Sequence, residues 1–208
     1  MNRPYLIGIA GGSGSGKTTI ANKIVSHFKD RILHIPHDHY YKAQDHLSIE
    51  ERVKTNYDHP NALETDFMIK QLQELLEGKE VQMPEYDFTT HTRKQETLTV
   101  KPAPLILVEG ILIYENKELR DLLQLKIFID VAADIRILRR LKRDVEERGR
   151  TIEMSINQYY ATARPMHNLY VEPTKHLADI LIPNGGYNEN GAQLIIDALE
   201  KRLENSSS

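Results

Sequence analysis

One segment of the sequence has residue types and spacing that suit phosphate binding. Gly11-Gly12-Ser13-Gly14-Ser15-Gly16-Lys17-Thr18 satisfies the pattern G-x-x-x-x-G-K-[ST]. Glycines let the backbone turn tightly and point its N–H groups inward, and the positive end of a following helix adds to the attraction for phosphate. Lys17 supplies a mobile charge for the terminal phosphates, and the Thr18 hydroxyl can ligate Mg²⁺. The segment therefore predicts a nucleotide-binding P-loop.

Two carboxylates follow apolar runs and could serve such a site. Glu109 ends the run 105–108, a position that suits an acid that holds or orients Mg²⁺ through its water shell. Asp38 follows the run 31–36, where it could orient an acceptor hydroxyl and take its proton. The structural alternatives are an ordinary strand-end acid for Glu109 and a turn cap for Asp38. The histidines that flank Asp38 are expected to be exposed loop residues and not metal ligands: His37 and His39.

A stripe of arginines could close over transferring phosphate. Its members fall at i, i+3, i+4 and i+7 of a helix: Arg136, Arg139, Arg140 and Arg143. Arginine makes forked contacts with phosphate oxygens, and a kinase needs a closing segment that excludes water and neutralises charge. The nearly opposite arc is apolar and can face a core: Ile137, Leu138, Leu141 and Val145. The alternative is a solvated charged face, partly neutralised by acids: Asp144, Glu146 and Glu147.

The elements that must position these residues alternate between strands and helices. Apolar runs predict strands at 5–10, 31–36, 105–108, 125–131 and 180–183. Helical spacing and stop signals predict helices at 17–28, 63–76, 132–147, 152–171 and 191–203. The segment 81–101 alternates like a pair of strands, with 95–100 as one arm. Such a pattern predicts a parallel sheet with helices on both faces, which binds ligands at the carboxyl ends of its strands.

Length and composition fit one α/β domain that spans 1–208. The chain has 208 residues and 40% hydrophobic content, and residues 205–208 are expected to form a flexible tail. A net charge of −3 gives no bulk attraction to nucleic acid or to an anionic membrane, so neither is expected as a partner. The absence of cysteine excludes disulfides and thiolate chemistry. Without a signal-like start or a long apolar run, the expected location is cytoplasmic.

Further strings occur in order along the chain. They are Asp38-His39-Tyr40-Tyr41, Asn56-Tyr57-Asp58-His59-Pro60, Pro84-Glu85-Tyr86-Asp87-Phe88, His91-Thr92-Arg93, Glu109-Gly110-Ile111-Leu112, and Arg139-Arg140-Leu141-Lys142-Arg143-Asp144 leading into Glu147-Arg148-Gly149-Arg150. Together with the P-loop, they resemble the uridine kinases (uridine–cytidine kinases), a family of P-loop nucleoside kinases, over residues 8–203. The resemblance implies a P-loop NTPase-type parallel sheet, a small substrate-binding β-hairpin insertion at 81–101 and an arginine-rich helical lid at 136–171.

The resemblance also implies a role for each matching position. The catalytic group contains the base for the acceptor hydroxyl and two cations: Asp38, Lys17 and Arg143. The Mg²⁺ site would use Thr18, Asp38 and Glu109. The ribose hydroxyls would be held by Asp58 and Arg140, and the pyrimidine ring by Tyr86, Phe88 and His91. Further substrate contacts would come from Tyr41, Ile111, Arg143 and Gln158. The donor phosphates would be bound by the P-loop together with Thr19, Arg148 and Arg150.

The implied reaction transfers phosphate from ATP, or from GTP, to the 5′-hydroxyl of uridine or cytidine, with Mg²⁺. The family also implies inhibition by UTP and CTP and a homotetramer. Physical chemistry agrees with the aromatic positions, because a pyrimidine offers a flat face for stacking on Tyr86 and Phe88. A neutral histidine can donate or accept a hydrogen bond, so His91 could serve either base. A 2′-deoxy substrate would leave Asp58 unpaired and should react poorly.

One departure and two alternatives remain open. Relatives often carry an arginine after the proline that ends the last strand, where this chain has Asn184, so the preference between ATP and GTP is not fixed. A phosphoribulokinase-like enzyme would need basic residues for an anionic acceptor in place of the aromatic segment. A nucleotide-dependent switch is the non-enzymatic alternative, but the sequence lacks the Asn-Lys-x-Asp string of guanine-reading switches.

Overall fold

Five parallel strands form the central sheet within residues 3–207, the part of the chain that the computed structural model describes. They are β1 (Tyr5–Gly11), β2 (Ile32–Pro36), β5 (Leu105–Glu109), β6 (Leu125–Asp130) and β7 (Ile180–Pro183). Their order across the sheet is β2-β5-β1-β6-β7, and every neighbouring pair is parallel. The predicted α/β fold with a parallel sheet is confirmed.

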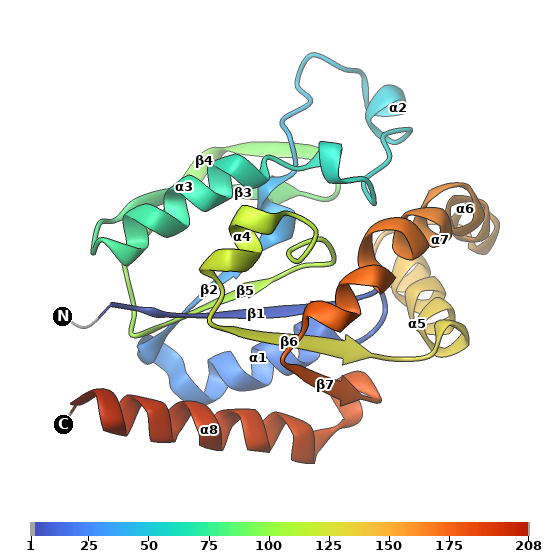
Figure 1. Cartoon of the computed structure of the whole chain (residues 1–208). Coiled ribbons are helices and arrows are strands. Elements are labelled where there is room, and N and C mark those ends of the chain that lie inside the picture. The colour runs from blue at the N-terminus through green and yellow to red at the C-terminus, as the bar shows by residue number, and fades with distance from the viewer. Residues whose placement is uncertain (1–2, 208) are drawn as a thin grey trace.

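Helices cover both faces of this sheet. They are α1 (Lys17–Phe28) and α8 (Glu189–Ser207) on one face, with α3 (Thr65–Leu76) and α4 (Lys117–Leu122) on the other (Figure 1). Because successive strand residues point to opposite faces, β1 contributes to two apolar cores. Leu6 joins the core under α3 and α4, whereas Ile7 and Ile9 join the core under α1 and α8. Burial on both faces explains why the strands read as continuous apolar runs.

A two-stranded antiparallel hairpin lies beside α3 on the same face. It consists of β3 (Val81–Asp87) and β4 (Thr92–Val100), and their register shifts between Pro84 and Tyr86. The hairpin predicted for 81–101 is confirmed, and β4 begins three residues before the expected arm. A loop that contains α2 (Ile49–Arg52) reaches back to the hairpin tip, where Arg52 donates a hydrogen bond to the carbonyl of Thr90 (3.0 Å).

The remaining helices stand beyond the carboxyl ends of the strands (Figure 1). They are α5 (Ala133–Glu146), α6 (Ile152–Gln158) and α7 (Arg164–Met166). The helix predicted for 152–171 is present throughout, but two π-helical segments, Tyr159–Ala163 and His167–Val171, widen its turns.

The expectation that the apolar arc of α5 faces a core is wrong, whereas its arginine stripe does lie toward the P-loop. Its apolar arc does not face a core, since Leu138 is 67% and Val145 40% exposed, while Arg140 is only 6% exposed. The reason is position: α5 has left the sheet, and its arginine face is turned toward the P-loop, where Asp144 provides a buried counter-charge.

The predicted C-terminal tail is also corrected. α8 continues to Ser207, so residues 205–207 are helical, and Ser208 lies outside the described residues. Once Ile195, Ile196 and Leu199 anchor the helix in the core, each added residue gains a backbone hydrogen bond at little further cost. Within the described residues, no helix combines the length and the hydrophobicity that a membrane crossing requires.

Candidate active site

The P-loop connects the carboxyl end of β1 to the start of α1. Gly14 and Gly16 have φ values of 79° and 87°, in the left-handed region that favours glycine. A Cβ at Gly14 would lie 2.3 Å from the carbonyl oxygen of Arg136, so the loop also needs glycine for its contact with α5. The Ser15 hydroxyl is buried and has no hydrogen-bond partner among the described residues. A phosphate oxygen at the loop could satisfy it.

Glu109 closes the side of the P-loop that faces the sheet. Thr18 Oγ1 donates a hydrogen bond to Glu109 Oε1 (2.6 Å), and Lys17 Nζ lies 3.9 Å from the same oxygen. His34 Nε2 is 3.4 Å from the other carboxylate oxygen. Burial alone would raise the pKa of Glu109, but the contacts with His34 and Lys17 outweigh it and leave the pKa lowered. Glu109 is therefore a carboxylate at neutral pH.

This arrangement fits Mg²⁺ better than a metal held by protein ligands alone. No group of three or more His, Cys, Asp or Glu side chains among residues 3–207 could hold a metal ion. Mg²⁺ typically uses one or two protein oxygens and completes its shell with phosphate oxygens and water. Thr18 and Glu109 present such oxygens beside the phosphate loop.

Asp38 lies just after β2 in the same cavity as Lys17. Its carboxylate makes no hydrogen bond or ion pair with any described residue. Burial raises the pKa of Asp38, and the charge of Lys17 partly offsets the shift. An unpartnered carboxylate with an elevated pKa can take a proton from a ligand hydroxyl.

The flanking histidines differ from the sequence-based expectation. His37 is not an exposed loop residue: it is 1% exposed, and its Nε2 lies 3.1 Å from Thr65 Oγ1. Burial lowers the pKa of His37 to about 4, so the ring is neutral at physiological pH. His39 is half-buried, and burial lowers its pKa as well. The turn that carries both histidines packs against α3 and the hairpin strand β3. The residue types alone did not indicate this packing.

A cavity of about 80 Å³ runs from the P-loop to the hairpin tip. The sequence-predicted substrate residues all line it: Tyr41, Asp58, Tyr86, Phe88, His91, Ile111, Arg140, Arg143 and Gln158. Lys17, Asp38, Arg148 and Arg150 line it as well. The volume is well below the roughly 300–1,000 Å³ of typical ligand pockets, so side chains must move to admit a ligand.

Aromatic rings form the wall of this cavity at the hairpin. Tyr57 stacks on His91 with centroids 5.5 Å apart, and Tyr41 packs on Tyr86 at 5.1 Å. The guanidinium of Arg148 lies 5.2 Å above the Phe88 ring. His91 has a φ of 53°, a left-handed conformation that is uncommon outside glycine and that occurs often at functional sites. Burial, with help from Arg150, lowers the pKa of His91 and favours a neutral ring.

Polar side chains form the opposite wall. Arg140 Nη1 lies 3.7 Å from Asp58 Oδ1, and Arg140 Nη2 donates a hydrogen bond to Gln158 Oε1 (3.1 Å). Arg150 donates to the same amide oxygen. A carboxylate next to a guanidinium can bind a vicinal pair of hydroxyls, because one group accepts and the other donates.

Asp144 lies behind four arginines of α5 and of the segment that follows it, and it is fully buried. Arg143 donates two hydrogen bonds to Asp144 Oδ1, from Nη2 at 2.8 Å and from Nε at 3.2 Å. Three further guanidiniums lie within ion-pair distance of this carboxylate: Arg140 at 3.4 Å, Arg148 at 3.8 Å and Arg150 at 4.0 Å. One acid therefore holds four cations at the edge of the cavity.

The loop after β7 packs against the other side of the P-loop. Lys23 donates a hydrogen bond to the carbonyl of Gly186 (2.9 Å), and Asn184 adopts a left-handed φ of 65°. Tyr187 is 82% exposed, and the Arg139 guanidinium lies 5.0 Å above its ring. An exposed ring beside a phosphate loop offers a stacking surface for a purine.

Comparison with known proteins places this site in a family. Residues 6–190 match the model of the phosphoribulokinase/uridine kinase family. The chain belongs to this family. A uridine kinase of Clostridium tetani is 52% identical over 98% of both chains, and one of Streptococcus pneumoniae is 52% identical over 98% of this chain and 97% of its own. The expected resemblance to uridine kinases is confirmed.

Solved structures agree with the fold. A structure named as a possible uridine kinase from Bacillus stearothermophilus has a TM-score of 0.61 at 19% identity and covers 88% of this chain and 90% of its own. The phosphoribulokinase of Rhodobacter spheroides has a TM-score of 0.64 at 14% identity and covers 88% of this chain and 70% of its own. At these identities the likeness concerns the fold alone.

Several residues of this family site were not singled out from the sequence. Tyr57 stacks on His91. It lies in the string Asn56-Tyr57-Asp58-His59-Pro60, so its neighbours could have indicated that it belongs to the site. Helical spacing marks Asp144 only as an acid that partly neutralises the arginine stripe, and it gives no sign of the complete burial of this side chain. His34 contacts Glu109 from the middle of β2, and no motif marks it.

Proposed function

We propose that this chain is a uridine kinase, which transfers the γ-phosphate of ATP to the 5′-hydroxyl of uridine or cytidine. The observation that carries the proposal is the cavity between the P-loop and the hairpin. An unpartnered carboxylate, Asp38, shares this cavity with Lys17 and with an aromatic wall suited to a flat, uncharged base. Relatives that share 52% of the sequence over nearly the full length carry the name uridine kinase.

The residues of the cavity have complementary tasks in this reaction. Asp38 accepts a hydrogen bond from the 5′-hydroxyl and takes its proton as the phosphoryl group arrives. Lys17 and Arg143 stabilise negative charge on the transferring group, and Arg148 and Arg150 close the lid over the donor phosphates. Thr18 and Glu109, with Asp38 nearby, would hold Mg²⁺, which would offset the charge of the phosphates.

Substrate selection follows from the two walls. Tyr86 and Phe88 sandwich or flank the pyrimidine, and neutral His91 matches the donor or acceptor of either base. Asp58 and Arg140 bind the two ribose hydroxyls. Opening of the cavity requires Arg148 to leave the face of Phe88, because the guanidinium now covers the ring on which a base would stack.

The remaining features follow from the same family resemblance. We include GTP as an alternative donor, feedback inhibition by UTP and CTP, a homotetramer and a cytoplasmic location in the proposal. Several apolar side chains of the lid are exposed, and grouped exposed apolar side chains are typical of surfaces that bind another protein, which supports self-association: Leu138, Ile152, Met154 and Tyr160.

A substrate panel tests the proposal. ADP release is measured with ATP and Mg²⁺ in the presence of uridine, cytidine, 2′-deoxyuridine, ribulose 5-phosphate or no acceptor. We expect rapid release only with uridine or cytidine. Preference for the sugar phosphate would identify a phosphoribulokinase-like enzyme, and equal release without acceptor would identify a nucleotide-dependent switch.

A further inference from the structure

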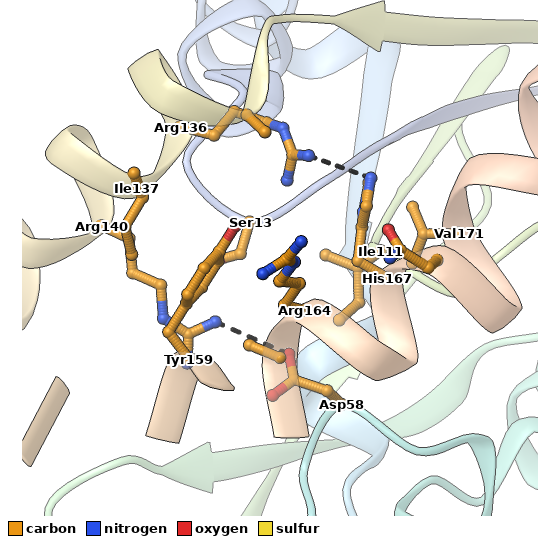
Figure 2. Close-up of a pocket in the computed structure, with 13 residues that line it drawn as sticks. Ser13, Asp58, Ile111, Arg136, Ile137, Arg140, Tyr159, Arg164, His167 and Val171 are labelled. Atoms are coloured by element: carbon orange, nitrogen blue, oxygen red, sulfur yellow. Dashed lines mark hydrogen bonds and ion pairs between the residues drawn. The ribbon is translucent and has the colours of Figure 1, made fainter. Parts of the chain in front are cut away.

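A second cavity adjoins the nucleoside cavity and has no task in the reaction above. Its volume is about 220 Å³, and it lies between α5, the P-loop and the helical segment 159–171 (Figure 2). Four residues line both cavities: Ser13, Asp58, Ile111 and Arg140. The ion pair between Asp58 and Arg140 therefore forms the partition between the two spaces.

The lining of this second cavity carries excess positive charge. Its arginines are Arg136, Arg140 and Arg164, and Asp58 is the one carboxylate among the lining residues that the structure describes. Figure 2 shows the Arg164 side chain reaching into the middle of the space, between Ser13 and His167. Its guanidinium makes no hydrogen bond or ion pair with any described residue. Arg136 likewise has no carboxylate within ion-pair distance in the described chain; it donates to the carbonyl of Val131 (3.0 Å) and lies 3.0 Å from His167 Nε2.

Two carboxylates behind the lining reduce this charge but do not cancel it, because both also act on Arg136 from outside the cavity lining. Glu172, half-exposed, lies 3.1 Å from His167 Nε2, and Asp130 is engaged by Lys175 at 2.6 Å. Burial and the neighbouring Arg136 lower the pKa of His167, so its ring is neutral at pH 7 and offers one donor and one acceptor. His167 Nδ1 is buried and has no hydrogen-bond partner among residues 3–207.

These observations point to a ligand with several acceptor oxygens and two negative charges. The guanidinium of Arg164, which is exposed and has no partner in the described part of the chain, can form a forked contact with phosphate, and His167 can use its unpartnered Nδ1. Because a water molecule's share of liquid volume is about 30 Å³, the cavity has ample room for the five heavy atoms of a phosphate group.

We propose that this cavity is a second anion site, which binds a phosphate dianion separately from the phosphates of the donor. The dianion can be free inorganic phosphate or a phosphate ester carried on the ribose of a pyrimidine nucleotide at its 2′- or 3′-oxygen. The second source rests on the proposed function, because it requires the ribose edge to face Asp58 and Arg140. The free-phosphate source does not depend on it.

The test first fills the donor site so that the P-loop cannot bind the probe. Enzyme saturated with Mg²⁺ and a non-hydrolysable ATP analogue is titrated with labelled inorganic phosphate, and in a second arm with uridine 3′-monophosphate in competition with uridine. We expect one additional equivalent of phosphate, or competition by the 3′-monophosphate, and the arm that responds identifies the source. No additional phosphate and no competition would overturn the proposal.

Two variants locate the site, and one serves as a matched control. Arg164→Gln removes an unpaired cation, and Asn168→Asp adds a negative charge to the lining without removing a contact. Each should weaken binding of the responding ligand at least tenfold and leave uridine affinity unchanged. Lys142→Gln makes the same charge change as Arg164→Gln on the exposed side of α5 and should have no effect. Equal binding by all three variants would place the anion elsewhere and refute the assignment, whatever the panel of acceptors shows.

Discussion

Replacing Asp144 with asparagine would remove the one negative charge that faces four lid arginines while nearly keeping the shape of the side chain. In the structure, Arg143 donates both of its hydrogen bonds to Asp144 Oδ1, at 2.8 and 3.2 Å. The amide of asparagine can still accept from Arg143, but as a neutral group. It would also place an NH₂ or a neutral oxygen against the guanidinium of Arg140.

The contacts give the size of the effect. A hydrogen bond to a charged group contributes about 1.5–3 kcal/mol and a neutral one about 0.5–1.5 kcal/mol, so two weakened bonds cost roughly 2–3 kcal/mol. Since a factor of ten corresponds to about 1.4 kcal/mol, kcat/KM should fall about 30- to 150-fold if Arg143 must be held for phosphoryl transfer. Loss of one partner from a buried ion pair also costs about 3–5 kcal/mol of stability, which lowers Tm by about 6–20 °C in a chain of this size.

The change in kcat/KM is measured by steady-state ADP release with uridine, ATP and Mg²⁺. The temperature is chosen so that the variant is fully folded. Thermal unfolding followed by circular dichroism measures the stability part. Glu146→Gln, which removes one negative charge from an exposed position on the same helix, is the control and should change neither quantity appreciably. If folded Asp144→Asn retains the parental kcat/KM, the lid arginines do not depend on this carboxylate, and the reasoning fails.

Further predictions concern three residues of the same site, Asp58, Asp38 and Tyr187. Uridine should exceed 2′-deoxyuridine in kcat/KM by about 10- to 150-fold, because the lost hydrogen bond to charged Asp58 contributes about 1.5–3 kcal/mol while Arg140 still pairs with the carboxylate, and comparable turnover of the two would exclude that role. Burial raises the pKa of Asp38, so kcat/KM should fall as the pH drops through a value above the 3.8 of an ordinary aspartate, as a pH–rate profile would reveal. Because the folded state raises the pKa of Asp38, ionising this side chain destabilises the fold at pH values above the folded-state pKa. Asp38→Asn should therefore raise Tm at pH 7 and lose that advantage below the unfolded-state pKa of about 3.9. An unchanged or lower Tm at pH 7 would contradict the pKa shift. Tyr187→Ala should raise the KM for ATP several-fold with little change in kcat, whereas Tyr187→Phe should behave as the parent, and equal KM values would place the purine elsewhere.

The sheet and its covering helices could be predicted because the pattern of apolar residues follows closely which side chains are buried. Leu105–Val108 had to be a strand with both faces covered, since each of its side chains is apolar and each is completely buried. The orientation of α5 could not be predicted in this way. An amphipathic pattern identifies two faces but not which one turns inward, and here a buried acid makes the arginine face the inner one.

The candidate site was predictable as a set of residues but not as a geometry. Ordered strings indicated the residues that are proposed to bind the nucleoside, and the structure brings all of them to one cavity. Contacts between distant segments carry no such signal, as with His34 on Glu109 or Tyr187 beneath Arg139. The second cavity is a further example, because Arg136 and Arg164 line it together only through the packing of α5 on the segment that follows it.

The role of Asp38 is tested most directly by Asp38→Asn, with binding and turnover measured side by side. Calorimetry should give parental Kd values for uridine and for a non-hydrolysable ATP analogue, because the amide keeps the shape of the site. Formation of 5′-UMP, followed by chromatography, should fall by about 10²- to 10⁴-fold, because the proton acceptor is gone. Turnover within tenfold of the parent, with both ligands bound normally, would mean that another group takes the proton.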